Sequence, residues 1–237
     1  MKRNVRLMVA LDTPSRDRAL DLIKVLRGQV PIFKVGLELY TAFGPAIVRE
    51  IRSFGVEVFL DLKLHDIPNT VARAAVEAAR LGVAFLDLHL SGGPAMIRRA
   101  VDEVDAVCNL HGLRRPALLG VTVLTSLGAE DLPGIGVSRS PEDQVLALAA
   151  LGKESGLDGV VASPRELGAL RAKFGPDFIL VAPGIRPDGS PADDQARTLT
   201  PREAVDAGAD FLVVGRPITG APDPAAAAGS ILRSILL

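Results

Sequence analysis

Short apolar runs alternate with longer segments of helical periodicity along the whole chain. The apolar runs are rich in Val, Leu, Ile and Phe, and they predict buried strands near residues 6–11, 32–36, 56–62, 85–89, 117–123, 159–162, 178–182 and 211–214. Between them, apolar residues recur at helical spacing and predict helices near residues 15–27, 44–53, 70–81, 94–104, 141–155, 164–174, 200–207 and 223–236. In the first of these helices Ser15 stands at a position typical of an N-cap.

The order of these elements gives eight strand–helix units. Continuous apolar strands that alternate with helices indicate a parallel sheet that helices cover. Eight such units in 237 residues predict an α/β fold with one domain, residues 1–237, closed into a (β/α)8 TIM barrel. A doubly wound open sheet is the structural alternative. The longest irregular stretch, residues 183–199, has a length typical of lids and binding loops.

The third strand departs from the apolar pattern. In Phe59-Leu60-Asp61-Leu62-Lys63-Leu64 successive side chains point to opposite faces, so Asp61 and Lys63 share one face and the leucines take the other. Buried charges are costly unless they are paired. An exposed strand with a surface ion pair is the alternative, but the neighbouring residues are too apolar for it. Asp66 follows where Ile-Pro-Asn-Thr predicts a turn into a helix.

Polar residues, including those of the third strand, collect at or near the C-terminal ends of the predicted strands. Active sites of barrels lie at this end of their strands. In chain order these residues are Asp12, Lys34, Asp61 with Lys63, His89, Thr122 with Thr125, Arg186 and Arg216. Single residues have structural explanations: Asp12 could cap a turn, Asp66 could be a helix N-cap before Pro68, and His89 could be a hydrogen-bonded core residue. Their joint placement at one end of the barrel favours an active site there.

A phosphate site is predicted after the last two strands. Gly215-Arg216 follows the apolar run 211–214, and a glycine lets backbone N–H groups approach a phosphate while the guanidinium binds it. Arg186 supplies a second cation from the preceding loop, and these loops form the common phosphate site of such barrels. No His or Cys cluster has metal-ligand spacing, and neither dinucleotide nor P-loop fingerprints occur. The sequence therefore predicts chemistry without cofactor or metal on a phosphorylated small molecule.

Composition narrows the remaining classes. The chain has 27 Lys and Arg against 28 Asp and Glu, without a basic stripe, so we do not expect a nucleic-acid partner. The apolar run after the basic N-terminus is short and is broken by Asp12, so we expect neither a signal peptide nor a membrane span. The single cysteine, Cys108, is interpreted as a small buried residue and suits a reducing cytoplasm, where we expect the protein.

The segment Asp61-Leu62-Lys63-Leu64-His65-Asp66-Ile67-Pro68-Asn69-Thr70 resembles the signature of the orotidine 5′-phosphate decarboxylase family, in its bacterial form without fused domains. The likeness covers essentially the whole chain. It includes, in order, Val9-Ala10-Leu11-Asp12, Phe33-Lys34-Val35-Gly36, Val121-Thr122-Val123-Leu124-Thr125-Ser126, Pro183-Gly184-Ile185-Arg186, Asp194-Gln195 and Val214-Gly215-Arg216. Sugar-phosphate decarboxylases of the same superfamily share the Asp-x-Lys-x-x-Asp core, whereas the His-Asp-Ile-Pro-x-Thr continuation is more specific.

This resemblance implies cofactor-free decarboxylation of orotidine 5′-phosphate to uridine 5′-phosphate, the last step of de novo pyrimidine synthesis. It implies that Lys63 protonates C6, that Asp61 faces the departing carboxylate, and that Lys34 and Asp66 complete an alternating charge network. It also implies a homodimer, in which Asp66 and Thr70 reach into the site of the other subunit.

The resemblance implies the substrate-binding residues as well. Asp12 and Lys34 would hold ribose hydroxyls, and Thr125 would contact the pyrimidine. Asp61, Ile67 and Thr70 would also contact the substrate, and the residues that bind phosphate would be Arg186, Gln195, Gly215 and Arg216. Phosphate binding would then close the loop at residues 183–199 and raise the rate.

Two other functions stay open. A magnesium-dependent sugar-phosphate decarboxylase that acts on a β-keto acid would need additional acidic metal ligands, and a magnesium requirement would favour it. A phosphosugar-binding barrel without activity would bind nucleotide without turnover. The costly internal charge cluster argues against the second alternative.

Overall fold

Eight parallel strands close into a barrel. The computed structural model describes residues 5–187 and 198–236. Its strands are β1 (Arg6–Ala10), β2 (Ile32–Gly36), β3 (Glu57–Leu64), β4 (Phe85–His89), β5 (Ala117–Val121), β6 (Gly159–Val161), β7 (Ile179–Ala182) and β8 (Phe211–Val214). Each strand pairs in parallel with the next, and β8 pairs with β1 to complete the ring. The closed ring confirms the predicted barrel and decides against an open sheet.

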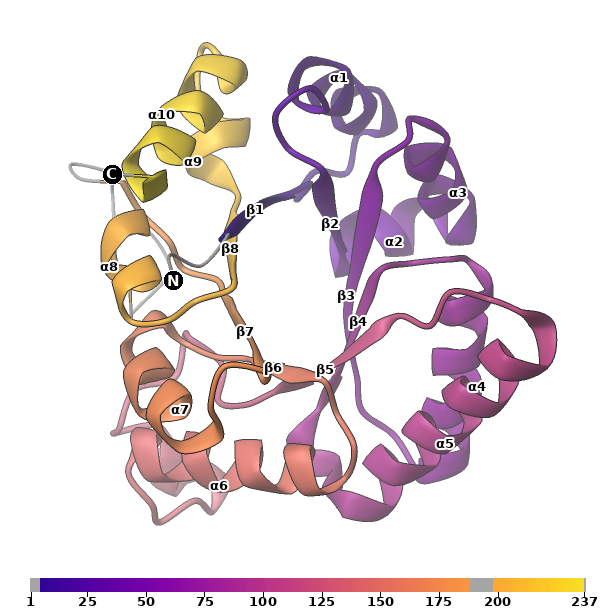
Figure 1. Cartoon of the computed structure of the whole chain (residues 1–237), viewed down its shortest axis with the longest axis vertical. Coiled ribbons are helices and arrows are strands. Elements are labelled where there is room, and N and C mark those ends of the chain that lie inside the picture. Colours follow the sequence, from indigo (N-terminus) through magenta and orange to yellow (C-terminus); the bar gives the residue numbers. More distant parts are fainter. Residues whose placement is uncertain (1–4, 188–197, 237) are drawn as a thin grey trace.

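Helices surround this barrel on its outside (Figure 1). They are α1 (Arg16–Leu26), α2 (Leu37–Phe43), α3 (Pro45–Ser53), α4 (Pro68–Arg80), α5 (Gly93–His111), α6 (Pro141–Glu154), α7 (Leu167–Phe174), α8 (Pro201–Asp206), α9 (Arg216–Thr219) and α10 (Pro224–Leu236). Three short 3-10 helices lie at Leu90–Gly92, Leu132–Ile135 and Pro164–Glu166. As predicted, Ser15 is the N-cap of α1, where its side chain accepts a hydrogen bond from the N–H of Arg18.

The alternation of side chains along the strands divides the core into two layers. The larger layer lies between strands and helices, and Leu60 and Leu86 belong to it. The smaller layer fills the barrel interior, and includes Phe59, Phe85 and Phe211, whose rings pack edge to face. Side chains that continue the interior alternation toward the C-terminal ends of the strands must therefore lie above this aromatic floor.

Among the differences from the sequence prediction, three have a clear local reason. Helix α2 was not predicted, because it begins at Leu37, directly after Gly36, the last residue of β2, with no turn between them. Helix α5 runs to His111 rather than to residue 104, and ends where Gly112 adopts a left-handed conformation with φ of 60°. Strand β3 continues to Leu64 through an irregularity in its pairing with β4. All three differences depend on local backbone geometry, which the periodicity of apolar residues does not report.

Candidate active site

Charged side chains form the layer immediately above the aromatic floor. Lys34 lies two residues after Ile32, Asp61 two residues after Phe59, and Asp87 two residues after Phe85, so all three continue the interior face of their strands. All three are buried. The predicted orientation of Asp61 is therefore confirmed: it faces the inside of the barrel, not solvent.

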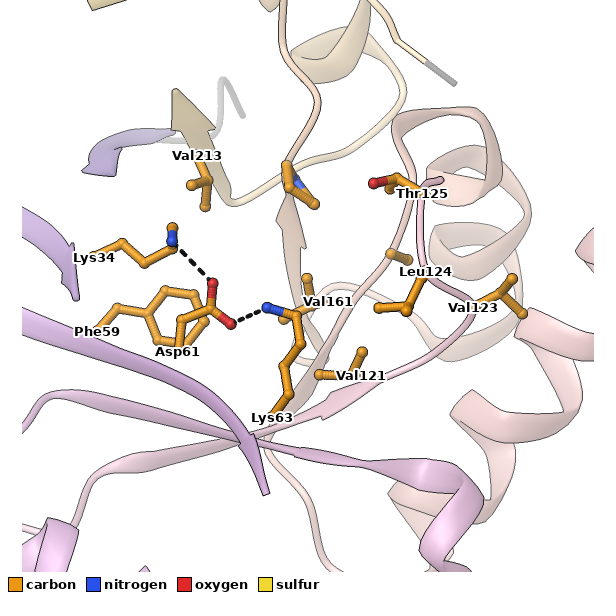
Figure 2. Close-up of a pocket in the computed structure, with 12 residues that line it drawn as sticks. Lys34, Phe59, Asp61, Lys63, Val121, Val123, Leu124, Thr125, Val161 and Val213 are labelled. Atoms are coloured by element: carbon orange, nitrogen blue, oxygen red, sulfur yellow. Dashed lines mark hydrogen bonds and ion pairs between the residues drawn. The ribbon is translucent and has the colours of Figure 1, made fainter. Parts of the chain in front are cut away.

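These side chains form a continuous chain of ion pairs (Figure 2). Lys34 Nζ lies 3.0 Å from Asp12 Oδ1 and 3.1 Å from Asp61 Oδ2. The other oxygen of Asp61 accepts a hydrogen bond from Lys63 Nζ. The two ammonium groups thus approach one carboxylate from different sides, and opposite charges alternate along the chain.

Burial and pairing act in opposite directions on the pKa values of this chain. Burial alone would raise the pKa of Asp61, but the charges of Lys34 and Lys63 outweigh it and hold the pKa well below its ordinary value. Burial would lower the pKa of Lys34, yet Asp61 and Asp12 keep it above its ordinary value. Asp61 and Lys34 are therefore both charged at neutral pH.

The backbone of Lys63 is strained. Its φ of 50° is the one positive φ found among non-glycine residues that the structure describes. A left-handed conformation costs such a residue about 1–2 kcal/mol, and it persists only when neighbouring groups impose it. Lys63 stands in the pairing irregularity of β3, and its N–H donates to Asp87 Oδ1 at 2.8 Å. The ammonium is thus presented from a distorted strand rather than a regular one.

Asp87 belongs to this site, although the sequence analysis did not single it out. Its side chain is fully buried. Burial and the neighbouring Asp61 raise the pKa of Asp87 well above its ordinary value. An acidic residue inside the apolar run Phe85-Leu86-Asp87-Leu88 was the available signal. It was overlooked because no charged residue shares its face within that run.

A pocket with a volume of about 100 Å³ opens beside the ion chain. Lys34, Asp61 and Lys63 form its polar wall, and Thr125 lines it from the loop after β5. Most other lining side chains are apolar, namely Phe59, Val121, Val123, Leu124, Val161, Ala162, Pro183 and Val213. Figure 2 shows several of them across from the Lys63 ammonium. Low polarity around fixed charges strengthens their action on a bound molecule.

Asp66, Ile67 and Thr70 do not line this pocket in the single chain. All three are exposed, and Ile67 keeps 67% of its surface accessible. Asp66 accepts a hydrogen bond from the N–H of Ile67 at 2.6 Å. Helix α4 has Ile67 rather than Asp66 at its N-cap position, so the helix-cap explanation for Asp66 is wrong.

The predicted phosphate residues lie at the same end of the barrel. Arg186 follows β7, and its N–H donates to the carbonyl of Leu199 at 3.0 Å, which joins the two ends of the loop. Gly215 is the N-cap of α9, which begins with the exposed Arg216. A Cβ atom on Gly215 would lie 3.6 Å from Asp12 Oδ2, so this turn adjoins the ion chain. Gln195 lies outside the described residues.

Three other predicted residues take ordinary structural places. The Thr122 hydroxyl donates to the carbonyl of Val161 at 3.0 Å. His89 is half-buried against His65, with ring centroids 5.4 Å apart. The pKa of His89 is lowered, mainly by burial and to a smaller extent by the neighbouring His65. Cys108 is buried on α5, as expected, and burial raises the pKa of its thiol. It is a packing residue.

Within residues 5–187 and 198–236, no group of three or more His, Cys, Asp or Glu side chains could hold a metal ion. No helix in this part of the chain is long and apolar enough to cross a membrane.

Comparison with known proteins places this site in a family context. The family model described as "Orotidine 5'-phosphate decarboxylase / HUMPS family" matches residues 5–231. The chain is 51% identical to the orotidine 5′-phosphate decarboxylase of Syntrophotalea carbinolica, over 97% of this chain and 94% of the relative. It is 53% identical to that of Paramagnetospirillum magneticum, over 94% and 95% of the two chains. The crystal structure of the enzyme from Lactobacillus acidophilus superposes with a TM-score of 0.87 at 38% identity, covering 99% of this chain and 100% of that one.

Proposed function

Because the chain belongs to the orotidine 5′-phosphate decarboxylase / HUMPS family, we propose that Lys63 is the proton donor in the decarboxylation of orotidine 5′-phosphate. The enzyme class is a carboxy-lyase that acts on this nucleotide. The observation that carries the proposal is the ion-pair chain Lys34–Asp61–Lys63 on the wall of an otherwise apolar pocket, in which Lys34 and Asp61 are buried and Lys63 is partly exposed. The product would be uridine 5′-phosphate, so the enzyme would act in the final step of de novo pyrimidine synthesis.

The reaction breaks one carbon–carbon bond and forms one carbon–hydrogen bond. Both electrons of the bond between C6 and the carboxylate remain on C6, and carbon dioxide leaves. The resulting carbanion lies in the plane of the ring and is poorly conjugated with the carbonyl groups. An N–H bond of the Lys63 ammonium then breaks as its proton forms the new C6–H bond. The neutral amine recovers a proton from water before the next turnover.

The fixed charges of the pocket suit this reaction. An ammonium that is already oriented stabilises developing negative charge without a reorganisation cost during the reaction. The ionised Asp61 holds Lys63 in place and would face the substrate carboxylate. Asp61 would repel this carboxylate in the bound substrate, and the repulsion would disappear once neutral carbon dioxide forms. The apolar side chains opposite Lys63 keep water from weakening these interactions.

The remaining roles extend the same proposal along the substrate. Asp12 and Lys34, paired at 3.0 Å, would hold ribose hydroxyls. Thr125, which lines the pocket, would contact the pyrimidine ring. Arg186, Gly215 and Arg216 would bind the phosphate together with Gln195. One domain over residues 1–237 and a location in the cytoplasm also remain predictions.

A deuterium experiment tests the proton transfer. Uridine 5′-phosphate that the purified enzyme forms in D2O should carry deuterium at C6, because the Lys63 ammonium exchanges its protons with solvent before each turnover. Proton NMR of the product measures this directly. Product with protium at C6 would contradict a solvent-exchanging donor.

We further propose that the active unit is a homodimer, with Asp66 and Thr70 directed into the pocket of the other subunit. The exposed run from His65 to Thr70 supports this arrangement. Leu37, directly after β2, and Leu124, near the pocket, are also exposed, at 57% and 38%. Exposed apolar side chains near a pocket are typical of an interface.

A mixing experiment tests the shared site. Lys63→Ala and Asp66→Ala chains should each be inactive alone and should regain activity when mixed, because one of the two sites in a mixed dimer would then have both native residues. Differently tagged chains, co-purified through both tags, allow turnover to be measured on mixed dimers alone. Continued inactivity of verified mixed dimers would contradict a site shared between subunits.

Gly36 provides a test of how closely Lys34 is positioned. A Cβ atom there would lie 2.9 Å from Lys34 Nζ and 3.3 Å from Asp12 Oδ1, so Gly36→Ala must displace the ammonium. We expect kcat to fall by about tenfold or more, since small misplacements in an active site are costly. Unfolding free energy should change little, because the displaced atom ends a flexible side chain.

Gly168→Ala is the matched control for this variant, because outside the adjoining backbone of its own helix no atom lies within 4 Å of the position that its Cβ would take. It should leave kcat unchanged and slightly stabilise α7. Equal kcat values for the two variants would show that turnover does not depend on the position of the Lys34 ammonium.

A further inference from the structure

We propose that Asp87 is a positioning residue for the proposed decarboxylation, acting as a neutral carboxylic acid that binds both Asp61 and the backbone of Lys63. The inference rests on the proposed function for its kinetic consequences. The protonation of Asp87 can be tested independently of activity.

The strand pairing places Asp87 opposite the distorted part of β3. Leu60 pairs with Leu86, and the next pair joins Leu64 with Leu88. Between these pairs β4 contributes Asp87 alone, whereas β3 contributes three residues, including Asp61 and Lys63. Such a bulge redirects side chains and removes regular ladder hydrogen bonds. Asp87 is therefore the single residue of β4 that faces the bulge carrying the two central ions.

The two oxygens of Asp87 have different surroundings. Oδ1 accepts the hydrogen bond from the N–H of Lys63 at 2.8 Å. Oδ2 is buried, and no hydrogen-bond donor reaches it within residues 5–187 and 198–236. A buried oxygen without a donor is costly. The cost disappears if Oδ2 itself carries a proton and donates it to a carboxylate.

Asp61 is the carboxylate in reach of that proton. It interacts with the side chain of Asp87, and two ionised carboxylates in this buried place would repel each other. The neighbouring ammonium groups favour ionisation of Asp61, so the proton resides on Asp87. The pKa of Asp87, which burial and Asp61 raise, agrees with this assignment.

The other neighbours of Asp87 do not supply an alternative partner. From β3 the charged groups that act on it are Asp61 and Lys63. Lys34 of β2 pairs with Asp61 at 3.1 Å and is not among the groups that act on Asp87. On its other flank, β5 pairs the apolar Leu119 with Asp87. His89, next on the interior face of β4, is directed to His65.

This arrangement couples the two halves of the catalytic ion pair. The proton of Asp87 orients the Asp61 carboxylate, and the oxygen of Asp87 holds the left-handed backbone of Lys63. A neutral amide has the same two functions, because Asn also presents one donor and one acceptor on a planar group. An apolar side chain of similar size has neither a donor for Asp61 nor an acceptor for the N–H of Lys63.

The test compares Asp87→Asn with Asp87→Leu. We expect Asp87→Asn to keep kcat within about threefold of the wild type at neutral pH. Asp87→Leu should lower kcat by about 10²-fold, the cost of misplacing catalytic groups. Its affinity for uridine 5′-phosphate, measured by calorimetry, should stay nearly unchanged. A thermal melt of each variant establishes that the compared proteins are folded.

The pH dependence separates a proton donor from a packing residue. The wild type should lose activity as pH rises through the raised pKa of Asp87, and Asp87→Asn should lack this loss. Any decline that both proteins share belongs to other groups. Since the pKa of Asp87 is raised in the folded state, the wild type should also lose stability relative to Asp87→Asn as pH rises from the ordinary value of 3.8 toward the folded pKa. The unfolding equilibrium constants should diverge by up to about tenfold per pH unit.

Three results would overturn the inference. Asp87→Asn as slow as Asp87→Leu would mean that the negative charge of Asp87 is required. Full activity in both would mean that Asp87 positions nothing. A stability difference that does not change with pH would mean that Asp87 does not hold the proton. Wild type that leaves orotidine 5′-phosphate unconverted would instead refute the proposed function, and the stability comparison would still decide the protonation of Asp87.

Discussion

Replacement of Lys63 by alanine is expected to abolish turnover while the folded protein still binds uridine 5′-phosphate. On the proposed mechanism, the variant would lose both the proton donor and the positive charge next to the carbanion. Loss of a general acid typically costs about 10²–10⁴-fold, and loss of one electrostatic contact about 10²–10³-fold. We therefore expect kcat to fall by more than about 10⁴-fold. Steady-state kinetics and calorimetric binding measure the two effects separately.

Lys24→Ala is the control for this experiment. Lys24 is exposed on α1, pairs with Asp21 at 2.8 Å and does not line the pocket. Its removal should leave kcat unchanged. Turnover of Lys63→Ala within tenfold of the wild type would refute the assignment of Lys63 as proton donor.

Asp61→Asn should reduce both activity and stability. It removes the carboxylate charge between two ammonium groups, and the Lys34 side chain, 11% exposed, would keep only Asp12 as an ionic partner. Breaking a buried ion pair from one side costs about 3 kcal/mol. We expect that loss of unfolding free energy in denaturant titrations. The kcat should fall by about 10³-fold or more, because Lys63 loses the group that orients it.

The sign of the pH dependence follows from the lowered pKa of Asp61. Its stabilising contribution is present above the ordinary value of 3.8 and disappears as pH falls from there toward the folded-state pKa. The stability gap between wild type and Asp61→Asn should therefore narrow below about pH 4. Asp21→Asn, which breaks an exposed pair, is the control and should lower the free energy of unfolding far less than Asp61→Asn does. Equal losses at Asp61 and Asp21 would contradict a buried network.

Residue periodicity was sufficient for the barrel and for the core of the site. All eight strands were predicted near their observed positions, because buried parallel strands are short and apolar. The inward orientation of Asp61 follows from the two-residue repeat of a strand. The placement of Lys34 near Asp61 could also be predicted, because the ends of neighbouring parallel strands meet on one rim of the barrel.

Other features depend on geometry that a linear pattern does not contain. The left-handed conformation of Lys63 requires the bulge in β3, and the role of Asp87 requires that bulge to lie across from it. The closeness of Gly36 to Lys34 Nζ is likewise a matter of three-dimensional packing. The proposed roles of Asp66 and Thr70 involve a second subunit, and neither residue lines the pocket of the single chain.

The most direct test of the account is the ultraviolet absorbance of orotidine 5′-phosphate, followed with purified protein in the presence of EDTA. We predict that the substrate absorbance disappears and that uridine 5′-phosphate is the product. This result would establish both the reaction and its independence from a dissociable metal ion. Unchanged absorbance with folded, dimeric protein, or conversion that requires added magnesium, would contradict the account and favour the sugar-phosphate reaction.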